Sequence, residues 1–353
     1  FKIREANRMK IYFTSTIAAA AISIGLGSSF SANAVTLKGE TASPGCPYTV
    51  FIMTAKYASK AGVNIQVSDG KTLTKSMLLM AQKKLDIAST VPAATVFMGK
   101  GVAMYKKLGK KAVAMHKKLR GMFSYQCGLY MMIVWDENKE IKIWKDLKGK
   151  RIFTGPPSGA AAKMSEDYIK AMTGYKPNKE YTAVRLNWGG GQDAMRNGQL
   201  DGYMRPLTVP SALMDELTAI RPVRILGIGD DQLDNPLLKK LLAVPGRSMG
   251  VLKVGDYKGV SNLTKDIRSP AYALSQQVGV HVSTDVVYKI TKAFWSNIGE
   301  IHKNDPYLSG MTLKSALDKL KAPLHLGAYK FYKEKGISAV SYTHLTLPTN
   351  REV

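Results

Sequence analysis

Residues 151–172 read RIFTGPPSGAAAKMSEDYIKAM, and this stretch contains the unit from which the fold can be inferred. Residues 151–154 are a short apolar run typical of a strand. The turn GPPSG at 155–159 leads from this strand into a helix over 160–172. A strand that passes directly into a helix is the repeating unit of α/β proteins. The stretch therefore predicts an α/β fold.

The same alternation of short strands and helices occurs on both sides of this stretch. Residues 63–67 (VNIQV) alternate as a strand does, and residues 76–84 carry a helical apolar stripe. Ser283 is a favoured residue type at a helix start, and the apolar positions that follow it fall on one helix face. Further strands are predicted at 86–88 and 200–204, and a short helix at 193–197.

Two apolar strands are expected to cross between two groups of these units. Residues 129–135 (LYMMIVW) are almost wholly apolar, and residues 222–227 are rich in Val, Ile and Leu. Crossing strands of this kind predict two lobes joined by a hinge. The first lobe would be discontinuous, made of residues 35–134 and 226–339, and the second lobe would be residues 135–225.

The beginning of the chain has the pattern of a secretory signal peptide. Met9–Lys10 is basic, residues 11–26 are mostly apolar, and Ala32-Asn33-Ala34 is a small-residue cleavage site. The apolar run is shorter than the roughly 20 residues that span a bilayer. We therefore assign residues 1–34 to upstream residues and a signal peptide, and we expect a periplasmic mature protein. A retained membrane anchor is the alternative.

The end of the chain is expected to be non-native. Residues 340–353 have no periodicity that continues what precedes them, and they resemble the translation of a sequencing adapter. His344 should therefore carry no function.

The net charge of +25 at pH 7 limits the classes of partner. A net positive charge this high is typical of proteins that bind nucleic acid, an anionic surface or an anionic ligand. Secretion argues against nucleic acid. The lysine pairs at 106–107, 110–111 and 117–118 have helical spacing and indicate a solvated helix face.

The two cysteines, Cys46 and Cys127, leave two possibilities open. In an oxidising compartment they could form a disulfide, and otherwise they would be two buried thiols. Their spacing matches no metal-binding motif.

No catalytic or cofactor motif is present. The sequence contains no G-x-S-x-G elbow, no H-E-x-x-H, no Walker loop and no G-x-G-x-x-G. His116, His281, His302 and His325 are scattered singly, and no pair of carboxylates stands out. We therefore predict that the chain is not an enzyme and uses no cofactor or metal.

Polar, glycine-containing turns next to predicted strands are the candidate binding sites. In the turn at 155–159, Ser158 and Gly159 would point backbone N–H groups at a carboxylate or phosphate. The alternative is a plain strand–helix turn capped by Ser158. The turn GKTLTKS at 70–76 offers Lys71, Thr72 and Thr74 to an anion, with the same alternative.

Two further turns and one arginine complete the set. Trp188 and Gln192 lie in the turn NWGGGQD, where the tryptophan could stack on a ligand or simply pack on the surface. Ser43 and Tyr48 lie in the turn SPGCPY near the mature N-terminus. Arg205 follows a strand and could bind a carboxylate with both guanidinium nitrogens, or form a surface ion pair. Taken together, these turns favour capture of an anionic solute between the lobes.

The chain resembles the TAXI class of solute receptors of tripartite ATP-independent periplasmic (TRAP) transporters, from about residue 37 to residue 337. The most specific segment is PLHLGAYKFYKEKG at 323–336, which is similar to the C-terminal signature of that class. Segments 144–150, 155–159, 197–203 and 285–290 are also similar.

This resemblance implies a type II periplasmic-binding-protein fold that closes on its ligand by a hinge motion. It implies a monomer that delivers its solute to a membrane-integral permease driven by an ion gradient. Related receptors are associated with glutamate, glutamine and other small carboxylates, so a carboxylate ligand is expected. Two other functions fit the sequence. One is a binding protein of the same fold for an ABC importer, and the other is a secreted surface antigen or adhesin with a vestigial cleft.

The chain departs from the class where the ligand should lie. It has PSGA at 157–160 where the class usually has GSGT, and GKTLTKS at 70–76 where the class has a G-G-S-x-x-N turn. Residues 80–86 likewise differ from the usual L-x-x-G-E-A-D. An extra lysine at 71 or 75 predicts a more highly charged anion than glutamate.

Overall fold

The computed structural model describes residues 35–42, 45–157 and 159–337. The expected leader, the expected non-native tail, Ser43 and Ser158 lie outside the described residues, and the predictions made for them stay predictions. In the described part, no helix has both the length and the apolar composition that crossing a membrane requires.

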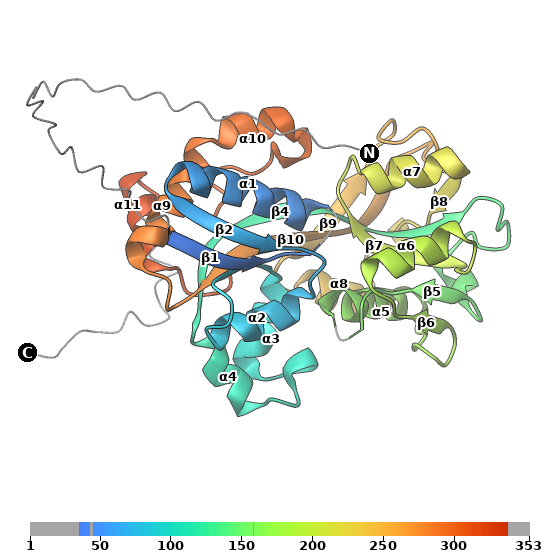
Figure 1. Cartoon of the computed structure of the whole chain (residues 1–353). Coiled ribbons are helices and arrows are strands. Elements are labelled where there is room, and N and C mark those ends of the chain that lie inside the picture. The colour runs from blue at the N-terminus through green and yellow to red at the C-terminus, as the bar shows by residue number, and fades with distance from the viewer. Residues whose placement is uncertain (1–34, 43–44, 158, 338–353) are drawn as a thin grey trace, which may run out of the picture. The chain divides into compact units, whose positions relative to one another are not determined.

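Ten strands of the described part form one mixed sheet (Figure 1). The sheet order is β2-β1-β3-β10-β4-β7-β5-β6, with β8 paired to β4 and β9 paired to β10. The strands are β1 (Val35–Glu40), β2 (Val63–Ser68), β3 (Ile87–Thr90), β4 (Leu119–Trp135), β5 (Arg151–Phe153), β6 (Thr182–Val184), β7 (Gly202–Leu207), β8 (Val223–Ile225), β9 (Arg247–Leu252) and β10 (Ile267–Gly279).

Two parallel groups of strands lie at the two ends of this sheet. The first module consists of β1, β2 and β3 with their helices, and its strands pair in parallel. The second module consists of β5, β6 and β7 with their helices, and its strands are also parallel. The long strands β4 and β10 lie between the modules and pair antiparallel with each other and with both groups. The predicted α/β class is confirmed, and β4 contains the crossing strand predicted at 129–135.

The helices fill the connections between these strands. They are α1 (Cys46–Lys60), α2 (Leu73–Ala81), α3 (Pro92–Lys100), α4 (Lys110–His116), α5 (Ala160–Thr173), α6 (Trp188–Arg196), α7 (Ala212–Ile220), α8 (Pro236–Leu242), α9 (Thr284–Ser296), α10 (Ile298–Asn304) and α11 (Leu326–Glu334). Near the end of the chain, α9 packs on both α1 and α11, so C-terminal helices cover part of the first module (Figure 1).

The prediction for the second crossing strand was wrong. Residues 222–227 contribute only the three-residue strand β8, which pairs with the last residues of β4. The second long strand is β10, which pairs with β3, β4 and β9. Its buried polar residues, Gln276 and Gln277, had broken the apolar pattern on which the prediction depended.

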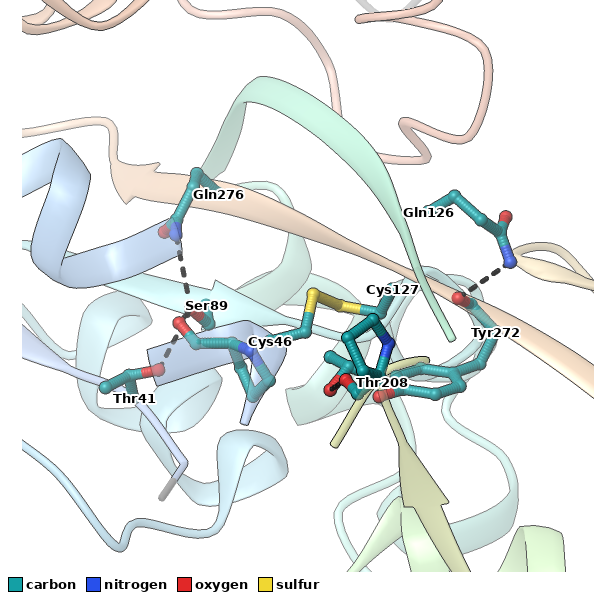
Figure 2. The surroundings of a disulfide bond; sticks show 10 residues. Thr41, Cys46, Ser89, Gln126, Cys127, Thr208, Tyr272 and Gln276 are labelled. Carbon is teal, nitrogen blue, oxygen red and sulfur yellow. Dashed lines mark hydrogen bonds between the residues drawn. A yellow bond between two sulfur atoms is a disulfide. The ribbon is translucent and has the colours of Figure 1, made fainter. Parts of the chain in front are cut away.

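A β-bulge in β4 places a cysteine against the first helix. Tyr272 of β10 lies opposite Gly128, and Ala273 lies opposite Gln126, so Cys127 is the extra residue between them. A bulge re-aims the side chain that it carries. Cys127 forms a disulfide with Cys46, the first residue of α1 (Figure 2). This bond ties the first module to a joining strand and settles the alternative that the sequence left open.

Gly128 is needed directly beside this bulge. A Cβ atom at position 128 would lie 2.0 Å from the carbonyl oxygen of Leu207 in β7. Only glycine lets the two backbones approach this closely. The bulge and the glycine together bring β4, β7 and α1 to one place.

Candidate functional site

A cavity of about 550 Å³ lies between the two modules. Both modules and both joining strands contribute to its lining. The modules approach each other at one edge of it, where a Cβ atom at Gly159 would lie 3.8 Å from the methyl carbon of Thr72. Concave sites of this size between two substructures are common places for small ligands.

Most of the predicted site residues line this cavity. The first module contributes Tyr48, Lys71, Thr72 and Thr74, and the second contributes Gly159, Trp188 and Arg205. Gln192 does not line the cavity, because its side chain points to Glu216 and donates a hydrogen bond of 3.1 Å to that carboxylate. A ligand contact by each of these residues stays a prediction.

Several helices begin at the cavity wall. First-turn residues of α1, α2, α3 and α5 line it, among them Cys46, Leu73, Ala93 and Ala160. None of these four helices has a side-chain cap among the described residues, and none has an acidic residue in its first turn. The first N–H groups of a helix have no partner within the helix, and its N-terminus carries a partial positive charge. These helix starts therefore add partial positive charge and N–H donors to the lining, next to apolar side chains such as Leu73 that come from the same helices.

Helix α6 begins earlier than predicted. The glycines at 189–191 were expected in a flexible turn, but they lie in the first turns of α6. The side chain of Asn187 accepts a 2.7 Å hydrogen bond from the N–H of Gly190 and caps the helix. Gly191 packs so closely on the Phe153 ring that a Cβ atom would lie 2.3 Å from it. Packing and capping thus hold Trp188 in a fixed helical position.

Arg205 lies within β7 and is only 2% exposed. Its Nη1 donates a 2.6 Å hydrogen bond to the hydroxyl of Tyr203, and its guanidinium lies 4.9 Å from the centre of the Trp188 ring. Its Nε has no hydrogen-bond partner, and no carboxylate in the described part of the chain pairs with it. The stacking on Trp188 offsets part of the cost of burying the charge.

Arg247 is a second buried arginine in the cavity wall. It is the first residue of β9, lies opposite Tyr272 of β10, and is 7% exposed. Its Nε and Nη1 have no hydrogen-bond partner among the described residues. Its guanidinium lies 5.7 Å from the centre of the Tyr168 ring. Arg205 and Arg247 therefore present two uncompensated positive charges to one cavity.

Tyrosines from the joining strands line the same cavity as these arginines. Tyr130 of β4 and Tyr272 of β10 both line the cavity, and their rings meet edge to face with centres 5.5 Å apart. Burial raises the pKa of both phenols above its usual value, although Arg247 opposes the rise at Tyr130 and Arg205 opposes it at Tyr272. Both hydroxyls stay protonated at neutral pH and can donate to an anion.

Sequence reasoning missed Arg247, Tyr130 and Tyr272. Tyr130 lies inside the apolar run 129–135, which was interpreted as buried strand only. Tyr272 lies in the strand that was not predicted. The available signal for Arg247 is the Pro245–Gly246 turn directly before it, a strand-end turn of the kind that located the other candidates.

The arrangement suits binding rather than catalysis. In the described residues, no group of three or more His, Cys, Asp or Glu side chains could hold a metal ion. Among the described residues, the polar groups that line the cavity are mostly guanidinium, ammonium, hydroxyl and backbone N–H donors, beside one carboxylate, that of Asp215. Such donors bind an anion and position it, and none of them is a nucleophile paired with a base.

A family model described as the NMT1-like family matches residues 47–336. Among similar solved structures is one from Bordetella bronchiseptica RB50, at 14% identity over 90% of this chain and 85% of that chain, with a TM-score of 0.49. Another is the periplasmic aliphatic sulphonate binding protein SsuA from Escherichia coli, at 12% identity over 89% and 84%, with a TM-score of 0.41.

A third similar structure is the periplasmic ectoine-binding protein from the TeaABC TRAP transporter of Halomonas elongata. Its identity is 13% over 88% of this chain and 96% of that chain, with a TM-score of 0.44. At identities and TM-scores this low, the three structures say nothing about the ligand of this chain. The match to the family model covers most of the chain, and it is this match that shows the family to which the chain belongs.

Proposed function

We propose, given that the chain belongs to the NMT1-like family of solute-binding proteins, that it captures a small organic anion of the carboxylate type in the cavity between its modules. The capture would take place in the periplasm, outside the cytoplasmic membrane. The bound solute would then pass to a membrane-integral transporter. The predicted leader supports the location, and the family consists of binding proteins rather than enzymes.

The two buried arginines are the observation that carries this proposal. Removing a charged group from water costs several kcal/mol unless an opposite charge compensates it. Arg205 and Arg247 have no such partner among the described residues, although both are almost fully buried. An anionic ligand would supply the missing charge and accept hydrogen bonds from the free guanidinium nitrogens.

For the transporter, we propose a TRAP-type secondary permease. The segment at 323–336 supports this choice because it is similar to the C-terminal signature of TRAP solute receptors. An ABC importer is the alternative. Reconstitution of the neighbouring membrane components in proteoliposomes separates the two. Uptake that depends on an ion gradient supports the TRAP permease, and uptake that depends on ATP refutes it.

Titration of the purified protein tests the ligand class. We expect mono-, di- or tricarboxylates to bind by calorimetry, and mass spectrometry of the solute released on denaturation to identify an anion. Arg205→Met should weaken binding by at least about 30-fold, which corresponds to the roughly 2 kcal/mol lost when one partner of a buried charge pair is removed.

A matched control is available on the surface. Arg268 forms an exposed pair with Asp230, so Arg268→Met removes an arginine without touching the cavity and should leave the affinity unchanged. Tightest binding to a neutral solute, or equal affinity of Arg205→Met and the unmodified protein for carboxylates, would refute the proposed function.

A further inference from the structure

The cavity has one wall that the proposed charge recognition does not use. Leu73, Val91, Phe97 and Met104 all line the cavity from the first module, and each is only half-buried. Their inner parts pack on the buried side chains of α1, α2 and α3. The uncovered parts leave apolar surface in contact with water, which is unfavourable until a ligand covers it.

The cationic groups are concentrated on the other side. Of the charged residues that line the cavity, only Lys71 comes from the first module. Arg205 belongs to β7 of the second module, and Arg247 to β9. Lys163 of α5 and Asp215 of α7 are the other charged residues of the lining, so among the described residues three of the four cationic side chains lie outside the first module, which contributes the wall of Leu73, Val91, Phe97 and Met104.

The size of the cavity also fits more than a charged head group. A volume of about 550 Å³ lies within the range of sites that enclose drug-sized ligands, roughly 300–1,000 Å³. A short dianion such as succinate has only two methylene groups, which are too few to cover Phe97 and Met104. A ligand that fills the cavity needs a charged end and an apolar body.

We infer that the ligand is an amphiphilic organic anion, with a carboxylate or sulfonate head at Arg205 and Arg247 and an alkyl or aryl body against the wall of Leu73, Phe97 and Met104. This inference rests on the proposed function, because it assumes that the cavity binds an anion. It replaces the more highly charged anion that Lys71 and Lys75 had led us to predict.

Calorimetric titration with straight-chain carboxylates from propanoate to decanoate tests this inference, with succinate and glutamate as short dianionic and zwitterionic probes. We expect the dissociation constant to fall about fourfold with each added methylene until the wall is covered, which corresponds to about 0.8 kcal/mol per buried methylene. The matching alkanesulfonates form a second arm that distinguishes the head group.

One substitution addresses the wall without touching the arginines. Met104→Gln keeps the length of the side chain and adds a polar amide, so it should flatten the dependence on chain length and leave propanoate affinity unchanged. Met53 in α1 is also half-buried but does not line the cavity. Met53→Gln is therefore the matched control and should keep the full chain-length dependence.

The outcomes separate this inference from the proposed function. If short anions bind but affinity does not increase with chain length, or succinate binds more tightly than decanoate, the amphiphilic ligand is refuted and anion capture stands. If Met53→Gln and Met104→Gln flatten the dependence equally, the wall is not the cause and the inference fails. If no anion in either arm binds, the proposed function itself is refuted.

Discussion

His325 begins helix α11 and uses both of its ring nitrogens. Its Nδ1 accepts a hydrogen bond from the N–H of Gly327, and its Nε2 lies 3.0 Å from the carbonyl oxygen of Val282. The ring therefore caps one helix and ties it to the loop before α9. The histidine of the segment that resembles the TAXI class therefore has a structural role. His325 lies outside the cavity lining.

This buried histidine should make folding sensitive to mild acid. Burial lowers the pKa of His325 from its ordinary 6.5 to about 4. As the pH falls from 6.5 towards 4, the unfolded chain binds a proton at this residue and the folded protein does not, so stability is lost in that window. At pH 5 the free energy of unfolding is lower by about 2 kcal/mol because of His325, since pH 5 lies 1.5 units below the pKa of this residue in the unfolded chain.

His325→Asn tests this, since asparagine can still cap the helix but does not titrate. Denaturant unfolding at pH 7 and pH 5 should show a smaller decrease in the free energy of unfolding for the variant than for the unmodified protein. His302 lies in the last turn of α10 and its Nε2 is 2.9 Å from the carbonyl oxygen of Met311, so His302→Asn is a control that should keep the decrease. Equal decreases in all three proteins would contradict the prediction.

At the scale of elements, the strand β10 explains which parts of the fold the sequence predicted. The strand–helix unit at 151–173 was predicted within a residue or two because its apolar periodicity is local. β10 was missed because Gln276 and Gln277 are polar and yet fully buried. Their amides donate to Ser89 and Thr95, which lie far away in the sequence. Such partners are visible only once the chain is folded.

The same reasoning applies to the candidate site. Arg205 became a candidate because it follows the expected strand 200–204, whereas it lies within β7, and nothing in the local sequence indicates that it would be buried without a carboxylate. Arg247 joins it in one cavity only because β9 pairs with β10 opposite Tyr272. The residue types were available in the sequence, and their convergence depends on strand order.

The disulfide between α1 and β4 should contribute strongly to stability. It closes a loop with a sequence separation of 81 residues, and bonds that close long loops typically contribute about 2–5 kcal/mol. Replacing both Cys46 and Cys127 by alanine should therefore lower the midpoint of thermal unfolding by roughly 3–8 °C for a chain of this size.

Treatment of the unmodified protein with a reductant gives an independent measurement of the same effect. The midpoint should fall to about that of the double variant, and the double variant should not respond to the reductant. Identical midpoints of the oxidised and reduced unmodified protein would show that the bond does not contribute to stability.

At the scale of the whole molecule, the two modules meet the ligand from opposite sides of the cavity. A ligand that contacts Arg205 and the wall around Phe97 binds both modules at once. It therefore favours the conformations in which the modules are closest, in proportion to its difference in affinity between open and closed states. The predicted pivots lie near Trp135, at the end of β4, and near Val223 in the short strand β8 that pairs with it.

Small-angle X-ray scattering tests this motion. Saturation with a bound carboxylate should decrease the radius of gyration of the purified protein. Arg205→Met, measured at the same ligand concentration, should show a smaller decrease because fewer molecules are occupied. An unchanged radius of gyration in the unmodified protein at full occupancy would contradict closure by a hinge.

The first module packs against segments from the far end of the chain, and this has a consequence for synthesis. β3 is made early, but its neighbour β10 and the covering helices α9 and α11 are among the last segments to leave the ribosome. Until then, one edge of β3 has no strand to pair with and α1 lacks its partner helix. The first module therefore cannot be completed before nearly the whole chain has been translated.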